Sequence, residues 1–546
     1  MSEEANMNRP HKETVKTGQR PVVQVEGLRL KYPGTEHLMF RDLTFSAAAG
    51  EKVLLLGPSG CGKSTLLQVL SGMIPNATEV PMKCTAQLLP RSWAYVFQDP
   101  DTQFCMPYVD EELAFVLENL SVPRAQMNER MQAVLLEVGL QLEELHVPIA
   151  HLSQGMKQRL ALASALLLEP EVLFLDEPSA LLDPEGREQI WEAVKAVSSN
   201  RTFIIVEHRI EEMADYVDRV VLFSATGEIL GEGSPADVFE RYQDELRAYG
   251  IWYPGVWEDY AESSAGRETF SSLVAAEFQQ SPAFEAKRDR NGTGAAGHVL
   301  KLGPFVGKRW ERPVISMPSA TVYSGEFIAI VGPNGAGKSS LLLSLMGLLR
   351  SEGNYTLCGE PVPLGNKRKE RQDRERQLRQ IGFVFQNPEL QFLTERISDE
   401  VAYSMLVDGA SREEAMKEAE DCLERFGLTG TGDRHPYQLS TGQKRRLSVA
   451  TAMARAPKIL LLDEPTFGQD ARNTFAILEM CEALRRAGTA ILMVTHEMQI
   501  AQRLATNIWE VAGGEVTSCI PGPRLLSSDV DPQAIERNPA VTGVMA

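Results

Sequence analysis

Gly57-Pro58-Ser59-Gly60-Cys61-Gly62-Lys63-Ser64-Thr65 is the stretch that decides the fold. It lies between the apolar run 53–56 and a second apolar run that begins at Leu66. This pattern predicts a buried strand that leads through a glycine loop into a helix, which is the setting of a phosphate-binding loop. The glycines let backbone N–H groups point inward, and the helix N-terminus adds partial positive charge. Lys63 is then placed to reach the β- and γ-phosphates of a nucleotide, and Ser64 to ligate magnesium.

The loop occurs a second time, which argues against a chance match. The second copy follows the apolar run 327–331 and reads Gly332-Pro333-Asn334-Gly335-Ala336-Gly337-Lys338-Ser339-Ser340. The sequence therefore predicts two nucleotide sites.

Other polar positions repeat in the same order, which predicts two copies of one domain. The matching pairs, 287 or 288 positions apart, are Gln98 with Gln386, Ser153 with Ser440, Asp176 with Asp463, and His208 with His496. The second copy carries an extra charged segment, 367–380, which is typical of a solvated helix face. We expect a disordered N-terminus (1–20), a first domain (21–245), an irregular linker (246–296), a second domain (297–522) and a loose tail (523–546).

The composition of the chain argues against several classes of protein. The net charge of −19 and the pI near 5.1 argue against a nucleic-acid binder that works by bulk charge. The seven cysteines include no C-x-x-C pair, so neither a zinc site nor a disulfide framework is indicated, and reduced cytosolic thiols are expected. The polar N-terminus does not resemble a signal peptide, and no run of eighteen apolar residues occurs. Any membrane role would therefore need a partner.

Acidic residues follow the apolar strands that are predicted to lie beside each phosphate-binding loop. Asp176 and Asp463 each end such a strand, where a carboxylate can hold magnesium beside the phosphates. The next residue is a glutamate in both copies, and it could orient or deprotonate the attacking water. A histidine ends the neighbouring strand in each copy; a lone histidine is more often structural, but matching positions favour a contact with the γ-phosphate. The catalytic candidates are Glu177, His208, Glu464 and His496.

Two further segments carry a family resemblance. Leu152-Ser153-Gln154-Gly155-Met156 and Leu439-Ser440-Thr441-Gly442-Gln443 resemble the L-S-G-G-Q signature of ATP-binding-cassette (ABC) ATPases. With the other motifs, the resemblance covers roughly residues 21–240 and 298–520. It implies an α/β fold of two P-loop NTPase cassettes, each with a mainly parallel sheet core, an antiparallel β subdomain and a helical subdomain. It also implies that the cassettes pair head to tail within one chain, with each ATP between one copy's P-loop and the other copy's signature.

The resemblance implies the site residues one by one. Tyr32 fits the aromatic that stacks on adenine; in the second copy Phe305 and Trp310 are candidates, and a core role is equally open. The implied ATP-binding set is Tyr32, Gly57, Pro58, Ser59, Gly60, Cys61, Gly62, Lys63, Ser64, Thr65, Gln98, Ser153, Gly155, Gly332, Pro333, Asn334, Gly335, Ala336, Gly337, Lys338, Ser339, Ser340, Gln386, Ser440 and Gly442. The implied Mg²⁺ ligands are Ser64, Gln98, Asp176, Ser339, Gln386 and Asp463.

Some positions depart from the family pattern. Gln154 and Met156 replace Gly and Gln of the signature, and Thr441 replaces Gly, so we expect two working sites of unequal rate. Cys61 of the first loop corresponds to Ala336 of the second, and its role allows two interpretations. It is either a reactive thiolate, favoured by Lys63 and the helix N-terminus, or a small buried residue that fits the loop.

The segments after the glutamines point to a subfamily. Residues 98–104 (QDPDTQF) and 386–392 (QNPELQF) resemble the Q-[DN]-P-x-x-Q-F of energy-coupling-factor (ECF) transporter ATPases, which drive uptake of vitamins and of cobalt or nickel ions. The chain resembles a fused version, of a kind linked with hydroxymethylpyrimidine or thiamine uptake. This implies a transport-coupled ATPase, peripheral at the cytoplasmic face of the cell membrane, with a transmembrane coupling protein and a substrate-binding membrane protein as partners. The alternatives are a tandem-cassette translation factor on the ribosome, which usually has a basic helical linker, and the fused ATPase of a sugar importer.

Overall fold

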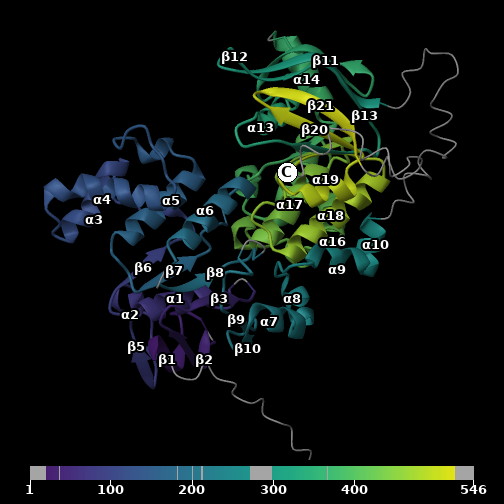
Figure 1. Ribbon diagram of the computed structural model, residues 1–546. Helices are drawn as coiled ribbons and strands as arrows, with labels where there is room; N and C mark the ends of the chain where they lie inside the picture. Colours follow the sequence, from purple (N-terminus) through teal and green to yellow (C-terminus); the bar gives the residue numbers. More distant parts are fainter. Residues whose placement is uncertain are drawn as a thin grey trace, which may run out of the picture. The chain divides into compact units, whose positions relative to one another are not determined.

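The computed structural model describes residues 20–270 and 298–522, apart from 36, 59, 181, 199–200, 211–212 and 366. The chain divides into two compact units, Met1–Pro254 and Gly255–Ala546 (Figure 1). The predicted N-terminal segment (1–20, except Arg20) and the tail (523–546) lie outside the described residues. Within the described ranges, no helix is both long and apolar enough to cross a bilayer.

The core of the first unit is a six-stranded sheet in the order β10-β9-β3-β8-β7-β6. All neighbours are parallel except β10 and β9, and buried apolar residues fill the central strands. The strands are β3 (Lys52–Leu56), β6 (Trp93–Val96), β7 (Val172–Asp176), β8 (Thr202–Val206), β9 (Arg219–Phe223) and β10 (Ile229–Gly233). Because the four strands that precede the predicted site residues run the same way, those residues meet at one edge of the sheet.

Two further subdomains complete this unit, and Figure 1 shows them towards opposite ends of the core sheet. One is an antiparallel sheet built from β1 (Pro21–Leu30), β2 (Phe40–Ala48), β4 (Met82–Lys83) and β5 (Ala86–Leu88). The other is helical and contains α3 (Val109–Asn119), α4 (Arg124–Glu137), α5 (Gln154–Leu166) and the short turns η1 (Pro100–Thr102) and η2 (Ile149–His151). The remaining helices are α1 (Lys63–Ser71), α2 (Met73–Asn76), α6 (Pro184–Ala196), α7 (Pro235–Arg241) and α8 (Gln243–Tyr249).

The second unit repeats this plan, with its two sheets joined into one of eleven strands. The junction is a single parallel bridge between Ser316 and Glu515. The core strands are β14 (Phe327–Val331), β17 (Ile381–Val384), β18 (Ile459–Asp463), β19 (Ala490–Val494), β20 (Asn507–Ala512) and β21 (Glu515–Pro521). The antiparallel part consists of β11 (His298–Arg309), β12 (Arg312–Met317), β13 (Ala320–Tyr323), β15 (Arg350–Leu357) and β16 (Glu360–Pro361).

The helices of the second unit follow the same order. They are α13 (Lys338–Leu345), α14 (Arg368–Leu378), α15 (Ile397–Val407), α16 (Arg412–Arg425), α17 (Thr441–Met453), α18 (Ala471–Arg486) and α19 (Met498–Leu504), with the turns η3 (Pro388–Gln391) and η4 (Pro436–Gln438). The predicted fold class is thus confirmed: each unit has a mainly parallel core, an antiparallel β subdomain and a helical subdomain. The predicted charged insert forms α14, which buries only Leu378.

The prediction of an irregular segment from residue 246 is wrong for its first part. After α8, the chain forms α9 (Val256–Glu262) and α10 (Ser264–Phe270). Tyr260 stacks on Phe475 of α18 with ring centroids 3.8 Å apart, and Trp257 meets the same ring edge-on at 5.1 Å. Seven-residue helices span two turns, too few to show a periodic apolar pattern, and tertiary packing stabilises them. Residues 271–296 lie outside the described residues.

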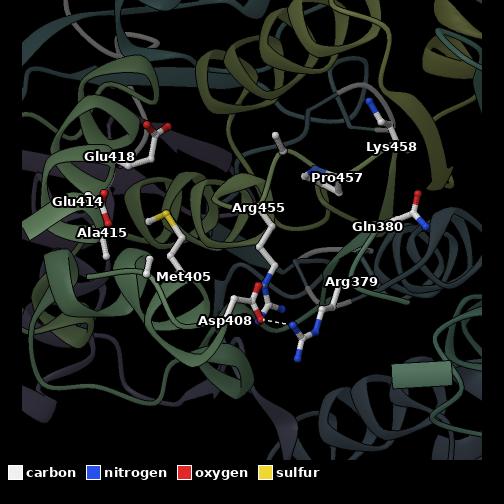
Figure 2. Close-up of a pocket in the computed structure, with 12 residues that line it drawn as sticks. Arg379, Gln380, Met405, Asp408, Glu414, Ala415, Glu418, Arg455, Pro457 and Lys458 are labelled. Atoms are coloured by element: carbon white, nitrogen blue, oxygen red, sulfur yellow. Dashed lines mark hydrogen bonds and ion pairs between the residues drawn. The ribbon is translucent and has the colours of Figure 1, made fainter. Parts of the chain in front are cut away.

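A charged joint connects the helical subdomain of the second unit to its core sheet. Asp408, just after α15, accepts a hydrogen bond of 2.6 Å from Arg455 and forms an ion pair of 2.8 Å with Arg379, which comes just before β17. These residues line a pocket of about 690 Å³ (Figure 2), where both guanidinium groups point at the Asp408 carboxylate. The equivalent positions of Asp408 and Arg455 in the first unit hold Leu120 and Leu168, both partly exposed.

A second difference between the copies concerns a glutamate that precedes a core strand. In the first unit Glu51 pairs with Arg219 at 2.6 Å. In the second unit the matching residues are Glu326 and Asn507, and their closest polar atoms lie 3.5 Å apart. Burial without a cation raises the pKa of Glu326 to about 7, although the Tyr323 N–H donates to its carboxylate. The charged form of Glu326 therefore destabilises the second unit.

This destabilisation predicts a pH-dependent effect of Glu326→Gln. The folded-state pKa lies above the unfolded one, so stability falls as pH rises through the range from about 4.5 to 7. At pH 8 we expect Glu326→Gln to stabilise the second unit by at most about 3 kcal/mol, and at pH 5 by little. Thermal unfolding followed by calorimetry at both pH values measures this. Asn507→Arg, which restores the pair of the first unit, should act in the same direction; equal effects at the two pH values would contradict the assignment.

Candidate functional site

Each P-loop follows the predicted order of strand, glycine loop and helix. In the first unit β3 leads into the loop, and α1 begins at Lys63. Gly60 and Gly62 have φ values of 83° and 101°, in the left-handed region that favours glycine. A Cβ at Gly62 would lie 2.8 Å from the ring of Phe40, so packing also requires glycine there. Ser59 lies outside the described residues; Pro58 and Cys61 lie in the loop, and Ser64 and Thr65 lie in the first turn of α1.

The lysine of each loop folds back over the loop's own carbonyls. Lys63 Nζ donates to Gly57 O at 2.8 Å and to Pro58 O at 3.1 Å. Lys338 Nζ donates to Gly332 O at 2.8 Å and to a second carbonyl of its loop at 2.9 Å. Each buried ammonium is thus held over the curl of its loop. The predicted second loop contains Pro333, Asn334, Gly335, Ala336, Gly337, Ser339 and Ser340, and it has the same conformation of strand, turn and helix.

The predicted magnesium ligands come together from two elements in each unit. Ser64 Oγ donates to Asp176 Oδ1 at 2.7 Å, and Ser339 Oγ to Asp463 Oδ1 at 3.0 Å. Burial raises the pKa of Asp176 and raises that of Asp463 to about 6. A hydroxyl and a carboxylate that converge in this way are oxygen ligands of the kind Mg²⁺ prefers, so the residues present fit the ion.

Tyr95 is a residue that the sequence analysis missed. Its hydroxyl donates to Asp176 Oδ2 at 2.7 Å. The equivalent position in the second unit holds Phe383, which has no hydroxyl, so the two aspartates are held differently. The signal was present as a Tyr–Phe difference between repeats, but the contact with Asp176 depends on the pairing of β6 with β7.

The predicted catalytic glutamates and histidines are paired in both units. Glu177 Oε1 lies 3.0 Å from His208 Nε2, and Glu464 Oε1 lies 3.0 Å from His496 Nε2. Burial opposes ionisation of each carboxylate, but the hydrogen bond and charge of the histidine outweigh it and lower the pKa of both glutamates. Both glutamates have positive φ values, 49° and 47°, a strained conformation that is common at functional sites.

The two predicted glutamine ligands occupy the same place, just after β6 and β17. Gln386 Nε2 donates to Glu464 Oε2 at 2.8 Å, so its amide contacts the catalytic candidate rather than Asp463. Gln98 is exposed at the matching position. The structure therefore brings Ser and Asp together as predicted metal ligands in each unit, but it does not bring Gln386 to that pair.

The signature serines lie at helix N-termini. Ser153 accepts from Met156 N at 3.3 Å and caps α5, whereas Ser440 caps α17 in a reciprocal box with Gln443. The first copy has no such box because Met156 replaces the glutamine. A Cβ at Gly442 would lie 2.3 Å from the Asn473 side chain, while one at Gly155 would meet only ordinary contacts. Packing within its own unit therefore explains the glycine at 442 but not the one at 155.

The predicted stacking aromatics differ in their surroundings. The Tyr32 hydroxyl forms a hydrogen bond of 2.9 Å with Thr65 Oγ1, which places this half-buried ring beside the first P-loop. Phe305 is buried in the core of the second unit, and Trp310 is 92% exposed. Of the two candidates in the second unit, only Trp310 has a face free for a ligand.

Cys61 fits the interpretation of a small buried residue. Its side chain is 1% exposed, and burial raises the pKa of the thiol even though Lys63 Nζ lies 3.9 Å away. We expect a maleimide to modify Cys61 much more slowly than the exposed Cys105 and Cys358, with or without MgATP, and Cys61→Ala to remain active. Peptide mass spectrometry over a labelling time course measures this. Fast labelling of Cys61 that MgATP blocks would instead support the thiolate interpretation.

Comparison with known proteins agrees with this geometry. The ABC transporter family model matches two segments, residues 40–180 and 315–467, which contain both P-loops and both signatures. A Bacillus subtilis (strain 168) protein with the provisional name HMP/thiamine import ATP-binding protein YkoD is 36% identical over 504 residues, covering 89% of each chain. A Streptococcus pneumoniae protein, provisionally named an ABC transporter ATP-binding protein, is 32% identical over 94% of this chain and 92% of its own.

One solved structure is also similar to part of the chain. It is cbiO1 from Clostridium perfringens, described as part of the ABC transporter complex cbiONQ, with 25% identity and a TM-score of 0.38. The match covers 46% of this chain and 99% of that one. The family match and the full-length relatives decide the identity. The chain belongs to the ABC transporter family, as an ATP-binding protein with two ATPase cassettes whose ATP hydrolysis is coupled to transport.

Proposed function

We propose that the chain is the ATP-hydrolysing subunit of an ECF-type importer, which powers uptake of a vitamin, a vitamin precursor or a metal ion through separate membrane subunits. The observation that carries this proposal is the pair of Q-[DN]-P-x-x-Q-F segments on matching turns, η1 and η3. The relative provisionally named for HMP/thiamine import supports it and favours a thiamine precursor as the substrate class. The subunit would lie at the cytoplasmic face of the membrane.

The residues of each cassette suggest the chemistry. Lys63 and Lys338 would bind the β- and γ-phosphates, and the helix N-termini behind them would add N–H donors. Magnesium, held by the Ser64–Asp176 and Ser339–Asp463 pairs, would neutralise charge on the phosphates. The glutamate of each pair would orient and deprotonate water, with the histidine holding the carboxylate and contacting the γ-phosphate.

Each ATP would also contact the signature of the opposite cassette. Ser440 and Gly442 would complete the first site, and Ser153 and Gly155 the second. The exposed positions of the two capping serines, and the absence of a packing reason for Gly155 within its own unit, support this arrangement. Closure of the cassettes on ATP and reopening after hydrolysis would drive the membrane subunit.

Side-chain exposure decides which residues of these segments are candidates for contact with that membrane subunit. The second glutamine of each segment turns its side chain inward: Gln103 Nε2 donates to Ala161 O at 3.1 Å, and Gln391 Nε2 to Ser448 O at 2.9 Å. These glutamines fasten the turns to α5 and α17. The neighbouring Leu390 and Leu393 are 72% and 70% exposed, so they are the better candidates for an apolar contact.

An affinity purification in mild detergent tests the proposal. The tagged chain should recover a polytopic membrane subunit, and Leu390→Asp with Leu393→Asp should abolish that recovery while ATP binding persists. Leu136→Asp is the matched control, because Leu136 is similarly exposed, at 69%, but lies on α4 of the other unit. Transport assays in vesicles with thiamine precursors and with Co²⁺ or Ni²⁺ then identify the substrate. Recovery of ribosomes without a membrane subunit would overturn the proposal.

A further inference from the structure

A buried carboxylate lies beside the catalytic candidates of the first unit. Glu207 follows β8 and precedes His208, and its side chain is 2% exposed. It accepts hydrogen bonds from the backbone N–H of His208 at 2.9 Å and from that of Ser179 at 3.0 Å, and it forms a third, short contact with Ser179 Oγ. All three donors are neutral groups.

These contacts connect the two segments that carry the catalytic pair. Ser179 lies two residues after Glu177, at the start of the turn that leads to α6. Glu177 and His208 face each other at 3.0 Å, and the Glu177 N–H donates to Val206 O at 2.9 Å. The ends of β7 and β8 are therefore joined by three links: the Glu177–His208 pair, the backbone bond from Glu177 to Val206, and the contact of Glu207 with Ser179.

Burying a carboxylate whose partners are all neutral costs free energy, because removal from water destabilises its charged form. Burial raises the pKa of Glu207, and the charge of Glu177 adds to this effect. The second unit has no carboxylate at the place of Glu207. The counterparts of Ser179 and Glu207 are Thr466 and Thr495, which are 2% and 1% exposed, and the Thr495 hydroxyl accepts from Glu497 N at 3.0 Å.

We propose that Glu207 is a positioning residue of the first ATP site: by joining Ser179 to the backbone of His208, it holds the Glu177–His208 pair in its reacting geometry. Glu207 does not touch the reacting atoms. Its loss should therefore slow hydrolysis at the first site and leave ATP binding, which depends on the P-loop, almost unchanged. The second site has no counterpart of this carboxylate.

The test measures kcat and KM for MgATP in the full chain with Glu464→Gln, so that turnover comes from the first site. Glu207→Gln keeps the volume but turns an NH₂ group toward one of the backbone donors, and we expect kcat to fall about tenfold and KM to change less than threefold. Ser179→Ala should lower kcat about threefold, and adding it to Glu207→Gln should cause little further loss because both act through one contact. If the two sites are so tightly coupled that the Glu464→Gln chain is inactive, Glu207→Gln is tested in the chain that keeps Glu464. Turnover then depends on both sites, and Glu207→Gln should lower its kcat by the same factor.

Two controls separate positioning from a general loss of structure. Thr495→Val, at the matching place in the second unit, should keep kcat within threefold of wild type. Thermal unfolding and binding of a fluorescent ATP analogue should show that the Glu207→Gln chain is folded and binds nucleotide; if it does not fold, Ser179→Ala alone decides. Unchanged kcat in a folded variant, equal changes in kcat and KM, or additive effects of the two substitutions would overturn the proposal.

Discussion

Glu177→Gln and Glu464→Gln should each lower ATP turnover at their own site by about a hundredfold or more, because an amide cannot accept the proton of the attacking water. Each glutamate lies 3.0 Å from a histidine, and each has a lowered pKa, so both are ionised bases at neutral pH. Phosphate release measured at saturating MgATP gives kcat for each variant. The double variant should hold two unhydrolysed ATP molecules per chain, which filtration with labelled ATP counts.

A nearby carboxylate outside the pair provides the control for this prediction. Glu185 is exposed in the first turn of α6, and Glu185→Gln should keep wild-type turnover. If one of the two single variants kept full activity, the catalytic assignment in that cassette would be wrong. If both did, the attacking water would be oriented by some other group.

Lys63→Ala and Lys338→Ala should each remove one of two bound nucleotides. Each lysine is 5% exposed, and its ammonium is held by two carbonyls of its own loop, where it can transfer its hydrogen bonds to phosphate oxygens. Losing two charge-assisted hydrogen bonds weakens binding by about 3 kcal/mol, or roughly a hundredfold. The number of ATP molecules bound per chain, measured by equilibrium dialysis with labelled ATP, should therefore fall from two to one in each variant.

Cys61→Ala is the matched control, since it alters the same loop without removing charge and reproduces the Ala336 of the second loop. Two nucleotides should remain bound to it. Full stoichiometry in Lys63→Ala would mean that the first loop does not depend on its lysine, and the model of two equivalent phosphate sites would fail.

The parts of the site that the sequence could predict are those encoded in short windows. An apolar run, a glycine loop and a following helix specify each P-loop locally, so Lys63 and Lys338 could be placed without knowing the rest of the fold. The two Asp–Glu steps could be placed as well, because a charged residue after a buried strand must lie at the edge of the sheet. The repeat then distinguished these positions from chance matches.

Burial and packing between distant segments could not be read in the same way. The sequence gives Cys61 a lysine neighbour, but the burial that raises its pKa comes from the surrounding core. Gln103 belongs to a motif that indicates a partner, yet its amide donates a hydrogen bond to a carbonyl of α5. The helix α9 packs on the ring of Phe475, more than two hundred residues away. The sequence analysis missed Tyr95 and Glu207 for the same reason, because their contacts join residues on or beside different strands.

The joint at Asp408 gives the two cassettes different responses to ionic strength. Ion pairs such as those of Asp408 with Arg379 and Arg455 weaken as salt rises, because mobile ions screen partly exposed charges. Leucines, which carry no charge for mobile ions to screen, stand at the places of Asp408 and Arg455 in the first cassette. A rise in ionic strength should therefore loosen the helical subdomain of the second cassette relative to its core more than that of the first.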